Sequence, residues 1–428
     1  MRNPILVALQ GKGMQKFVDR VRSLSSRYGL TASKMDRALA HFGRILSEYD
    51  SGATFPITAA ALARSPGVIE KYQAQNMEFA VHGFYHVDHS QLSRQQQVLE
   101  LSKARRLFDE RGVKSAGFRS PYLRYRDETL EAINESGFMY DSSHSLVWNV
   151  VNGQTTDSYL RVLEFYGARD AKKYPALPHI EKGIIEIPYC LPDDEALIER
   201  LPFSDDQARS QPWLDILDET HRLGELFTLG LHPERIFLCE IPLRNALQKA
   251  RSLSPRVWIA RLDEIANWWT RRAELKAKVI SNGADEYRLE ADQIEGLTVL
   301  SRNVEMLSPN RGWDGRYVQA IGNEIRFRFE TKPVIGLSPS SDPMLRAFLH
   351  QQGYIVENAE GAEDFSLHLH RPQFSREDER PLLDEIEDSD SALVKFGRWP
   401  DGAKSALSVT GDIDALTIWD YGLRILGK

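Results

Sequence analysis

The chain has 428 residues, a net charge of −7 and 27% charged residues, which is typical of a globular protein with two or three domains. It has no long run of Lys and Arg, so a function in binding nucleic acid through its phosphates is not expected. Its two cysteines, Cys190 and Cys239, are too few for a disulfide framework or a zinc site made of thiolates.

Hydropathy predicts no transmembrane segment, because no run of about 18 apolar residues occurs. The apolar run at the start of the sequence is short and lacks a small-residue cleavage site, which argues against a secretory signal. We therefore expect a cytoplasmic protein.

The first part of the chain alternates between helical and extended patterns. Residues 1–48 are predicted to be helical, and Met35, Leu39, Phe42 and Leu46 lie on one stripe at helical spacing. Short strands and amphipathic helices follow, with strands at 53–58, 78–81, 115–118 and 138–143 and helices at 94–112 and 127–137.

The same alternation continues to residue 278. Strands are predicted at 183–189 and 226–232, and helices at 213–224 and 261–278. Alternation of strands and helices over about 275 residues favours an α/β fold with a parallel sheet, either open or closed into a barrel.

The pattern changes near residue 277. Residues 277–331 are predicted to form a small β-rich unit with Gly and Asn turns, and 332–398 a small α/β connecting unit. The acidic segment 376–391 of this unit is predicted to be a solvated helix. Residues 399–428 contain a strand, a turn with two aspartates and a short helix, so the expected organisation is a main part at 1–276 followed by these three segments.

Two histidines follow the predicted strand at 78–81. His82 and His86 have the spacing of a pair of metal ligands, but Gly83 stands where the metallopeptidase motif H-E-x-x-H has its glutamate. A loop at the end of a strand can direct both imidazoles at one ion. A catalytic zinc site usually has three protein ligands and one open position, so this pair would need a carboxylate from elsewhere.

Two further segments carry polar groups at strand ends. Arg119, Pro121 and Tyr122 follow the strand at 115–118, and His232 ends the strand at 226–232. Pro121 stiffens its turn and removes one backbone donor. Taken alone, the segment 119–122 is explained equally well as a surface turn, and His232 as a structural histidine.

Together, these segments resemble the NodB-homology polysaccharide deacetylases, also called carbohydrate esterase family four. Three motifs of that family occur here in the family's order, with H-x3-H at 82–86, R-x-P-Y at 119–122 and L-x-L-H at 229–232. The resemblance covers 33–275 and 400–425 and implies an irregular (β/α) barrel.

One motif of the family is missing from its usual place. The motif T-F-D-D-G, or a D-x-D variant, normally comes first and supplies the catalytic base and the third metal ligand, but residues 1–32 contain no paired aspartates. The C-terminal segment SALSVTGDIDA resembles that motif, with Asp412 and Asp414 as the pair. The resemblance thus implies a circularly permuted barrel whose first strand comes from the C-terminus, either within one chain or in a strand-swapped homodimer.

The resemblance also implies a metal site and a base. His82, His86 and Asp414 would bind a divalent metal, with Zn²⁺ favoured and Co²⁺, Ni²⁺ or Fe²⁺ compatible with these ligand types. Asp412 would act as the general base, held charged and oriented by Arg119.

Further roles follow from the same resemblance. His232 would protonate the leaving amine, and the backbone N–H of Tyr122 would help to hold the oxyanion. Asp141 is matched loosely as the partner that orients His232, and Trp148 as a wall of the acetyl pocket. A capping aspartate and a plain core strand explain these last two residues equally well.

The adjacent carboxylates Asp193 and Asp194 are assigned to substrate binding, since similar segments of this superfamily lie near the substrate cleft. Their position at the start of a helix is the simpler explanation, because acidic residues favour the first helical turn.

The predicted function is removal of N-acetyl groups from an amino-sugar-containing polysaccharide or glycolipid intermediate by a metal-dependent hydrolase. Precursors of a bacterial exopolysaccharide are the expected substrates. Alternatives are a non-catalytic glycan-binding protein on a degenerate barrel and an amidohydrolase of a non-sugar amide. A zinc peptidase is disfavoured by the missing glutamate after His82.

Overall fold

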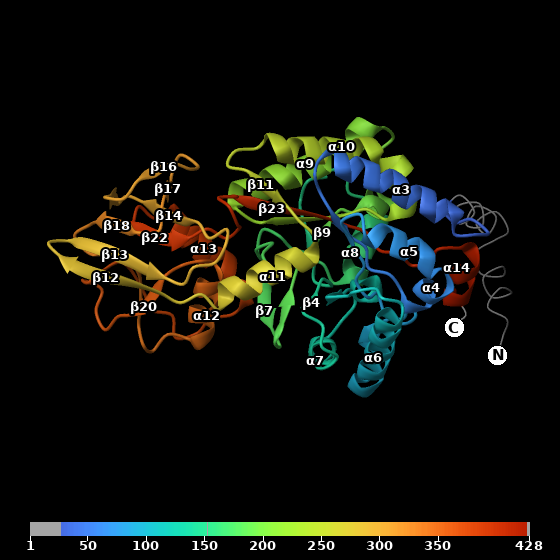
Figure 1. Ribbon diagram of the computed structural model, residues 1–428, viewed down its shortest axis with the longest axis horizontal. Helices are drawn as coiled ribbons and strands as arrows, with labels where there is room; N and C mark the ends of the chain where they lie inside the picture. Colours follow the sequence, from blue (N-terminus) through green and yellow to red (C-terminus); the bar gives the residue numbers. More distant parts are fainter. Residues whose placement is uncertain (1–26, 152, 426–428) are drawn as a thin grey trace.

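The computed structural model describes residues 27–151 and 153–425. Of the helical segment predicted at 1–48, residues 1–26 lie outside this description, and α3 spans Ser33–Glu48 with its predicted apolar stripe buried. None of the described helices is both long and apolar enough to cross a membrane. In Figure 1 the chain forms a larger part that extends to α11 and a smaller part made of residues 277–396, while the last strand, β23, and the last helix, α14 (Ile418–Ile425), lie in the larger part.

The larger part is built on short parallel strands. β1 (Ala53–Thr54) pairs with β2 (Met77–Glu78), and both β10 (Leu226–Gly230) and β11 (Val257–Ile259) pair with β23 (Ser405–Thr410). β23 also pairs with β1, so the strand order is β10–β23–β1–β2. All of these pairs are parallel, and the predicted α/β class is therefore confirmed.

Two further groups of strands continue this arrangement. The first has the order β3 (Gly117–Phe118), β4 (Tyr140–Asp141), β8 (Ile184–Glu186) and β7 (His179–Glu181), and the second β6 (Arg169–Asp170), β5 (Ser145–Val147) and β9 (Tyr189–Leu191). A parallel bridge between Val81 and Phe118 links the first group to the end of β2. The single strand predicted at 183–189 is thus divided between β8 and β9, which belong to different sheets.

Helices surround these strands. They are α4 (Ala59–Arg64), α5 (Pro66–Gln73), α6 (Arg94–Glu110), α7 (Asp127–Glu135), α8 (Asp157–Tyr166), α9 (Asp206–Leu223), α10 (Ile236–Ser252) and α11 (Leu262–Ala273). In Figure 1, α3, α9 and α10 lie along one side of the strands, and α6 and α7 lie along the other.

Two predicted helix boundaries are wrong. α9 begins well before residue 213, because the Asp205 side chain accepts a hydrogen bond from the Ala208 N–H and caps the helix, and Pro212 lies inside it. α11 ends before residue 278, because the chain from Ala277 onward pairs as a strand with β13.

The smaller part contains three sheets and two helices. Its strands before residue 332 are β12 (Ala277–Gly283), β13 (Glu286–Ala291), β14 (Val299–Arg302), β15 (Glu305–Met306), β16 (Asn310–Gly312), β17 (Val318–Ala320) and β18 (Ile325–Arg328). Its later elements are β19 (Lys332–Leu337), α12 (Pro343–Gln351), β20 (Val356–Asn358), β21 (Phe365–Leu369), α13 (Glu379–Asp388) and β22 (Leu393–Phe396).

The two predicted units at 277–331 and 332–398 share a sheet. β22 pairs with β14 in the order β16–β17–β14–β22, so strands from both segments form one hydrogen-bonded surface. The acidic helix α13 is not wholly solvated, since Leu382, Leu383 and Ile386 are buried.

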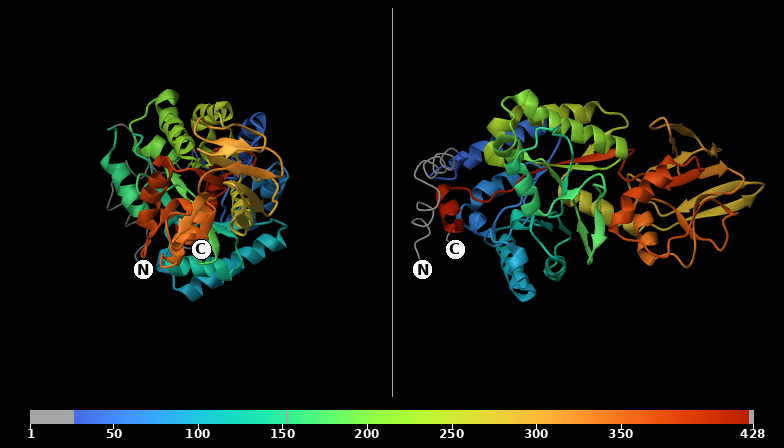
Figure 2. Two further views of the ribbon diagram at one scale, coloured as in Figure 1. Left: turned by 90° about the vertical axis from the view of Figure 1, so that its left-hand side faces the viewer. Right: turned by 180° about the vertical axis from the view of Figure 1, so that it is seen from behind.

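β23 carries the end of the chain back into the larger part, as the view from behind in Figure 2 shows. All six of its residues are buried, and Leu407 and Val409 belong to the same hydrophobic core as Leu229 of β10. β10 and β23 approach so closely at their ends that a Cβ at Gly411 would lie 1.8 Å from the carbonyl oxygen of Leu231. Glycine is therefore required immediately before the two C-terminal aspartates.

Candidate metal and catalytic site

The predicted site residues come from loops at the carboxyl ends of neighbouring parallel strands. His82 and His86 follow β2, Arg119 and Tyr122 follow β3, His232 follows β10, and Asp412 and Asp414 follow β23. Since the carboxyl ends of parallel strands share one edge, residues far apart in sequence meet there. A cavity of about 230 Å³ is lined by His86, Tyr122, Asp193, His232, Asp412 and Asp414, among others.

Three side chains are arranged as metal ligands. Asp414 Oδ1 lies 3.4 Å from His82 Nε2 and 3.2 Å from His86 Nε2, and the candidate ligand atoms all lie within 4.8 Å of one another. Two ligands bound tetrahedrally to an ion at about 2.1 Å would lie about 3.4 Å apart. The observed spacing thus fits a divalent metal.

The tautomer of His82 supports the same conclusion. Its Nδ1 donates a hydrogen bond to the carbonyl oxygen of Arg119 at 2.8 Å, so in the neutral ring Nε2 carries the lone pair. Nε2 is buried and makes no hydrogen bond in the described chain. A backbone acceptor on the second ring nitrogen is the usual way in which proteins orient a metal-binding imidazole.

Arg119 holds Asp412 in place. Its Nη1 donates to Asp412 Oδ1 at 2.9 Å, while its Nε and Nη2 donate to the carbonyl and hydroxyl of Ser142, each at 2.9 Å. Burial alone would raise the pKa of Asp412, but in the metal-free protein the charges of a protonated His82, of Arg119 and of His232 hold it below its usual range. The Asp412 carboxylate is therefore ionised and able to accept a proton.

Asp194, and not Asp141, is the partner of His232. His232 Nδ1 lies 2.8 Å from Asp194 Oδ1. Burial would lower the pKa of His232, but the charge of Asp194 outweighs it and raises the pKa to about 10. The imidazole thus carries a proton, as a general acid requires. Arg235 Nε, 3.4 Å from Asp194 Oδ2, contributes a second positive charge.

Three predicted roles therefore need correction. Asp141 accepts hydrogen bonds from the backbone and hydroxyl of Ser143 and does not contact His232. The Asp194 side chain is fully buried and forms ion pairs with His232 and Arg235, so it cannot bind substrate directly. Trp148 follows β5 and lines a different cavity, between α9 and α13, so it cannot form a wall of an acetyl pocket at this site.

Asp193 remains next to the site. It lines the catalytic cavity, and its carboxylate accepts hydrogen bonds from the Tyr189 hydroxyl at 3.1 Å and the Ala196 N–H at 2.9 Å. Burial, together with the charge of Asp194, raises the pKa of Asp193 to about 7. Its role in binding substrate stays a prediction.

Tyr122 lies in an unusual backbone conformation. Both Tyr122, with φ 62°, and Leu123, with φ 55°, are in the left-handed region. Consecutive left-handed residues other than glycine are strained, and such strain is concentrated at functional sites. The Tyr122 ring packs edge-on against His86, with ring centroids 4.4 Å apart.

Tyr189 is a site residue that the sequence analysis missed. The Arg119 guanidinium lies 4.7 Å from the centroid of its ring. Gly230 leaves room for Tyr189, because a Cβ there would lie 1.9 Å from the Tyr189 hydroxyl. A glycine inside a strand often marks such a close approach, so Gly230 was the available signal.

The His232–Asp194 pair should stabilise the metal-free protein in a defined pH range. Since folding raises the pKa of His232 from 6.5 to about 10, its contribution is complete below about pH 6.5 and is lost as the pH rises through 10. Folding lowers the pKa of Asp194, so its contribution is lost in acid. In urea denaturation, the difference in unfolding free energy between wild type and His232→Gln is expected to be larger at pH 6 than at pH 10.

The matched control is His350→Gln, which removes an imidazole that bonds to the Leu275 carbonyl in the smaller part. Equal destabilisation by His232→Gln at both pH values would contradict the ion pair.

Comparisons with known proteins agree with these motifs. Residues 33–140 match the sequence model of the family described as polysaccharide deacetylase. This span contains His82, His86, Arg119 and Tyr122 but neither His232 nor the C-terminal aspartates. The peptidoglycan deacetylase-like protein FGM2 of Gibberella zeae is 24% identical over 250 residues, which are 52% of this chain and 69% of that protein.

Solved structures are more distant. A crystal structure described as a probable polysaccharide deacetylase from Pseudomonas aeruginosa PAO1 has 20% identity and a TM-score of 0.44, covering 55% of this chain and 73% of its own. The Puue allantoinase has 20% identity and a TM-score of 0.41, covering 57% and 82%. The motifs and the curated relative agree with the family model, which matches residues 33–140 as a polysaccharide deacetylase domain.

Proposed function

We propose that this protein is a metal-dependent deacetylase that removes N-acetyl groups from an amino-sugar-containing polysaccharide or glycolipid, with a precursor of an exopolysaccharide as its substrate. One observation carries the proposal: Asp412 and Asp414, more than 300 positions after His82, lie beside that histidine in the cavity that His232 also lines. Candidate metal ligands, a candidate general base (Asp412) and a candidate general acid (His232) thus lie around one cavity.

His82, His86 and Asp414 would hold the metal, and Zn²⁺ suits two imidazoles and one carboxylate. When bound, such an ion would lower the pKa of a water ligand and polarise the acetyl carbonyl. Asp412 would take the proton of the attacking water, since Arg119 keeps it ionised and aims it at the cavity.

His232 would complete the reaction. As the C–N bond of the amide breaks, the imidazolium would give its proton to the leaving nitrogen, which becomes the amine of the sugar, and the acetyl group leaves as acetate. Asp194 would hold the ring in orientation and stabilise its charged form. The left-handed turn at Tyr122 supports a role for its backbone N–H in stabilising the oxyanion.

We also propose that the larger part is a circularly permuted NodB-type barrel. Support comes from the position of β23, which lies parallel to and between β1 and β10 although it is the last strand of the chain. Within one chain β23 already places Asp412 next to Arg119, so a strand-swapped homodimer is not needed to complete the site.

The test is acetate release from N-acetylglucosamine oligomers of two to six sugars. Protein depleted of metal with a chelator and reconstituted with Zn²⁺ should release acetate and yield partly deacetylated oligomers by mass spectrometry, whereas depleted protein should not. Allantoin tests the alternative of a ring amide. Turnover of allantoin without acetate release would overturn the proposal in favour of a non-sugar amidohydrolase. Glycan binding without turnover would favour the non-catalytic alternative.

A further inference from the structure

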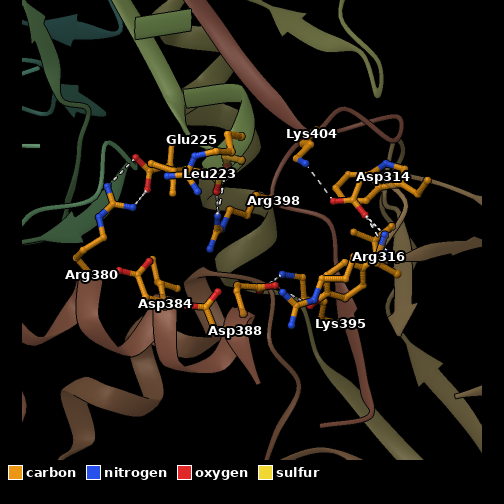
Figure 3. A pocket seen from close by; sticks show the side chains of 17 residues that line it. Leu223, Glu225, Asp314, Arg316, Arg380, Asp384, Asp388, Lys395, Arg398 and Lys404 are labelled. Carbon is orange, nitrogen blue, oxygen red and sulfur yellow. Dashed lines mark hydrogen bonds and ion pairs between the residues drawn. The ribbon is translucent and has the colours of Figure 1, made fainter. Parts of the chain in front are cut away.

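A second cavity lies at the junction of the two parts of the molecule. Its volume is about 320 Å³, within the range of small-molecule sites. It is lined by the end of α9 and the residues before β10, by the β16–β17 turn, by α13, and by Lys395, Arg398 and Lys404, which precede β23. Figure 3 shows Arg398 near its centre, between the Glu225–Arg380 pair and Lys395.

Arg398 makes no ion pair with any residue that the structure describes. Its Nη1 donates to the carbonyl oxygens of Leu223 at 2.9 Å and Gly224 at 3.4 Å, and its buried Nε makes no hydrogen bond within the described chain. No carboxylate of residues 27–151 and 153–425 lies within ion-pair distance of it. Arg398 is half-buried, and a guanidinium that is partly removed from water is stabilised by a counter-charge in contact.

A second arginine adds positive charge behind Arg398. Arg272 is 2% exposed, and its Nε and Nη2 make no hydrogen bond in the described part of the chain. It lies over the ring of Trp269, with 4.4 Å to the centroid. Burial and the neighbouring charge of Arg398 lower the pKa of Arg272 to about 9. Two arginines without an ion pair in the described chain thus lie close enough for their charges to repel each other.

Glu387, whose charge interacts with that of Arg398, is engaged by other groups. Glu387 Oε1 accepts from Lys395 and from the Tyr354 hydroxyl, each at 2.5 Å, and its Oε2 accepts from the Tyr317 hydroxyl at 2.8 Å. Burial would raise the pKa of Glu387, but the charges of Lys395 and then Arg398 lower it. Arg398 therefore feels this carboxylate at longer range without a direct contact, and most of the charge of Glu387 is balanced by Lys395.

The other paired carboxylates of the cavity are engaged in the same way. Asp314 pairs with Lys404 at 3.1 Å, and Glu225 pairs with Arg380. Neither of them is in direct contact with Arg398, so the guanidinium can accept a further anionic partner.

Other groups that line the cavity suit a sugar. Trp313 is half-buried, and its ring is held by a hydrogen bond from Nε1 to the Gly402 carbonyl at 2.9 Å. A fixed aromatic face can pack against the C–H face of a sugar ring. Asp384 and Asp388 are exposed on α13, where they can accept hydrogen bonds from hydroxyl groups.

The cavity continues along the larger part. An adjacent cavity of about 390 Å³ shares Arg222, Leu223, Arg380 and Asp384 with it and is also lined by Trp148. The two together offer room for more than one sugar.

We propose that this cleft is a binding site for an acidic sugar, whose carboxylate or phosphate pairs with Arg398 while its ring packs on Trp313. The site is separate from the catalytic cavity. Gly224 and Glu225 precede β10 and Lys404 precedes β23, whereas His232 and Asp412 follow the same strands. At about 3.3 Å per residue, strands of this length separate the two sites by about 20 Å. The proposal therefore does not depend on the deacetylation reaction.

The test is isothermal titration calorimetry of the full chain with four probes: trigalacturonate, glucose 6-phosphate, inorganic phosphate and N,N′,N″-triacetylchitotriose. Trigalacturonate, glucose 6-phosphate or both should bind, and the tighter of the two identifies the acidic group. Arg398→Gln should weaken that binding about tenfold or more, because a charge-assisted hydrogen bond is lost. Arg316→Gln, an exposed change in the same cavity, should weaken it less.

The matched control is Arg328→Gln. Arg328 lies on β18, away from the cleft, and pairs with Glu286 and Glu305. This variant should bind as wild type does, and so should the catalytic variant Asp412→Asn. Folding is checked by circular dichroism, and Arg316→Gln keeps the test valid if Arg398→Gln does not fold. Binding of acidic sugars that neither cleft variant weakens would overturn the proposal. Inorganic phosphate that binds as tightly as glucose 6-phosphate would overturn the sugar assignment.

Discussion

Asp414→Ala is expected to abolish both metal binding and acetate release while the fold is retained. Asp414 Oδ1 is the atom closest to both imidazole Nε2 atoms, and two histidines alone leave the ion with too few protein ligands. Metal content by elemental mass spectrometry should fall from about one ion per chain to almost none. Loss of the several kcal/mol that a metal supplies to the transition state should lower kcat/KM about a thousandfold or more.

The control for this variant is Asp109→Ala. It makes the same change of aspartate to alanine, but on the exposed face of α6 and far from the cavity. It should keep its metal and its activity. If folded Asp414→Ala kept a full complement of metal, the C-terminal motif would not be a ligand, and the permuted barrel would lose its main functional support.

Asp412→Asn is expected to separate metal binding from catalysis. An amide in place of the Asp412 carboxylate would keep the size of the side chain and could still accept a hydrogen bond from Arg119, but it could not take a proton from water. The variant should retain its metal while kcat falls about 10²- to 10⁴-fold, which is the usual contribution of a general base. Steady-state acetate release and metal content, measured on the same preparations, check both expectations.

Asp193→Asn is the matched control, since this carboxylate lines the same cavity and an amide there can still accept from the Ala196 N–H. If Asp193 binds substrate, its change should raise KM more than it lowers kcat. Equal activity of Asp412→Asn and wild type would exclude Asp412 as the base.

Local patterns in the sequence predicted several helices well. The segment 94–112 was expected to be helical, and α6 spans Arg94–Glu110 with a capping box between Ser93 and Gln96. The apolar stripe of α3 is buried as its spacing predicts. Such features depend on residues within a few positions of each other, and for that reason a single sequence reveals them. α9 begins before the predicted residue 213, because Asp205 caps it and Pro212 is accommodated inside it.

The sequence by itself also predicted the residues of the candidate site, because the motifs at 82–86, 119–122 and 229–232 resemble those of one enzyme family and occur in that family's order. It further indicated that the missing carboxylates come from Asp412 and Asp414, which the structure places beside His82.

Only the tertiary structure decided which carboxylate serves His232. Asp141 and Asp194 both lie near strand ends and look alike in sequence, yet Asp141 turns toward Ser143 and Asp194 toward His232. The tertiary structure also decided that Trp148 lies at the junction of the two parts, and that the buried Nε of Arg398 makes no hydrogen bond with the described residues. The physical reason is that ion pairing and burial depend on distances between segments that no sequence spacing encodes, and a shift of a few ångströms decides whether two charges meet.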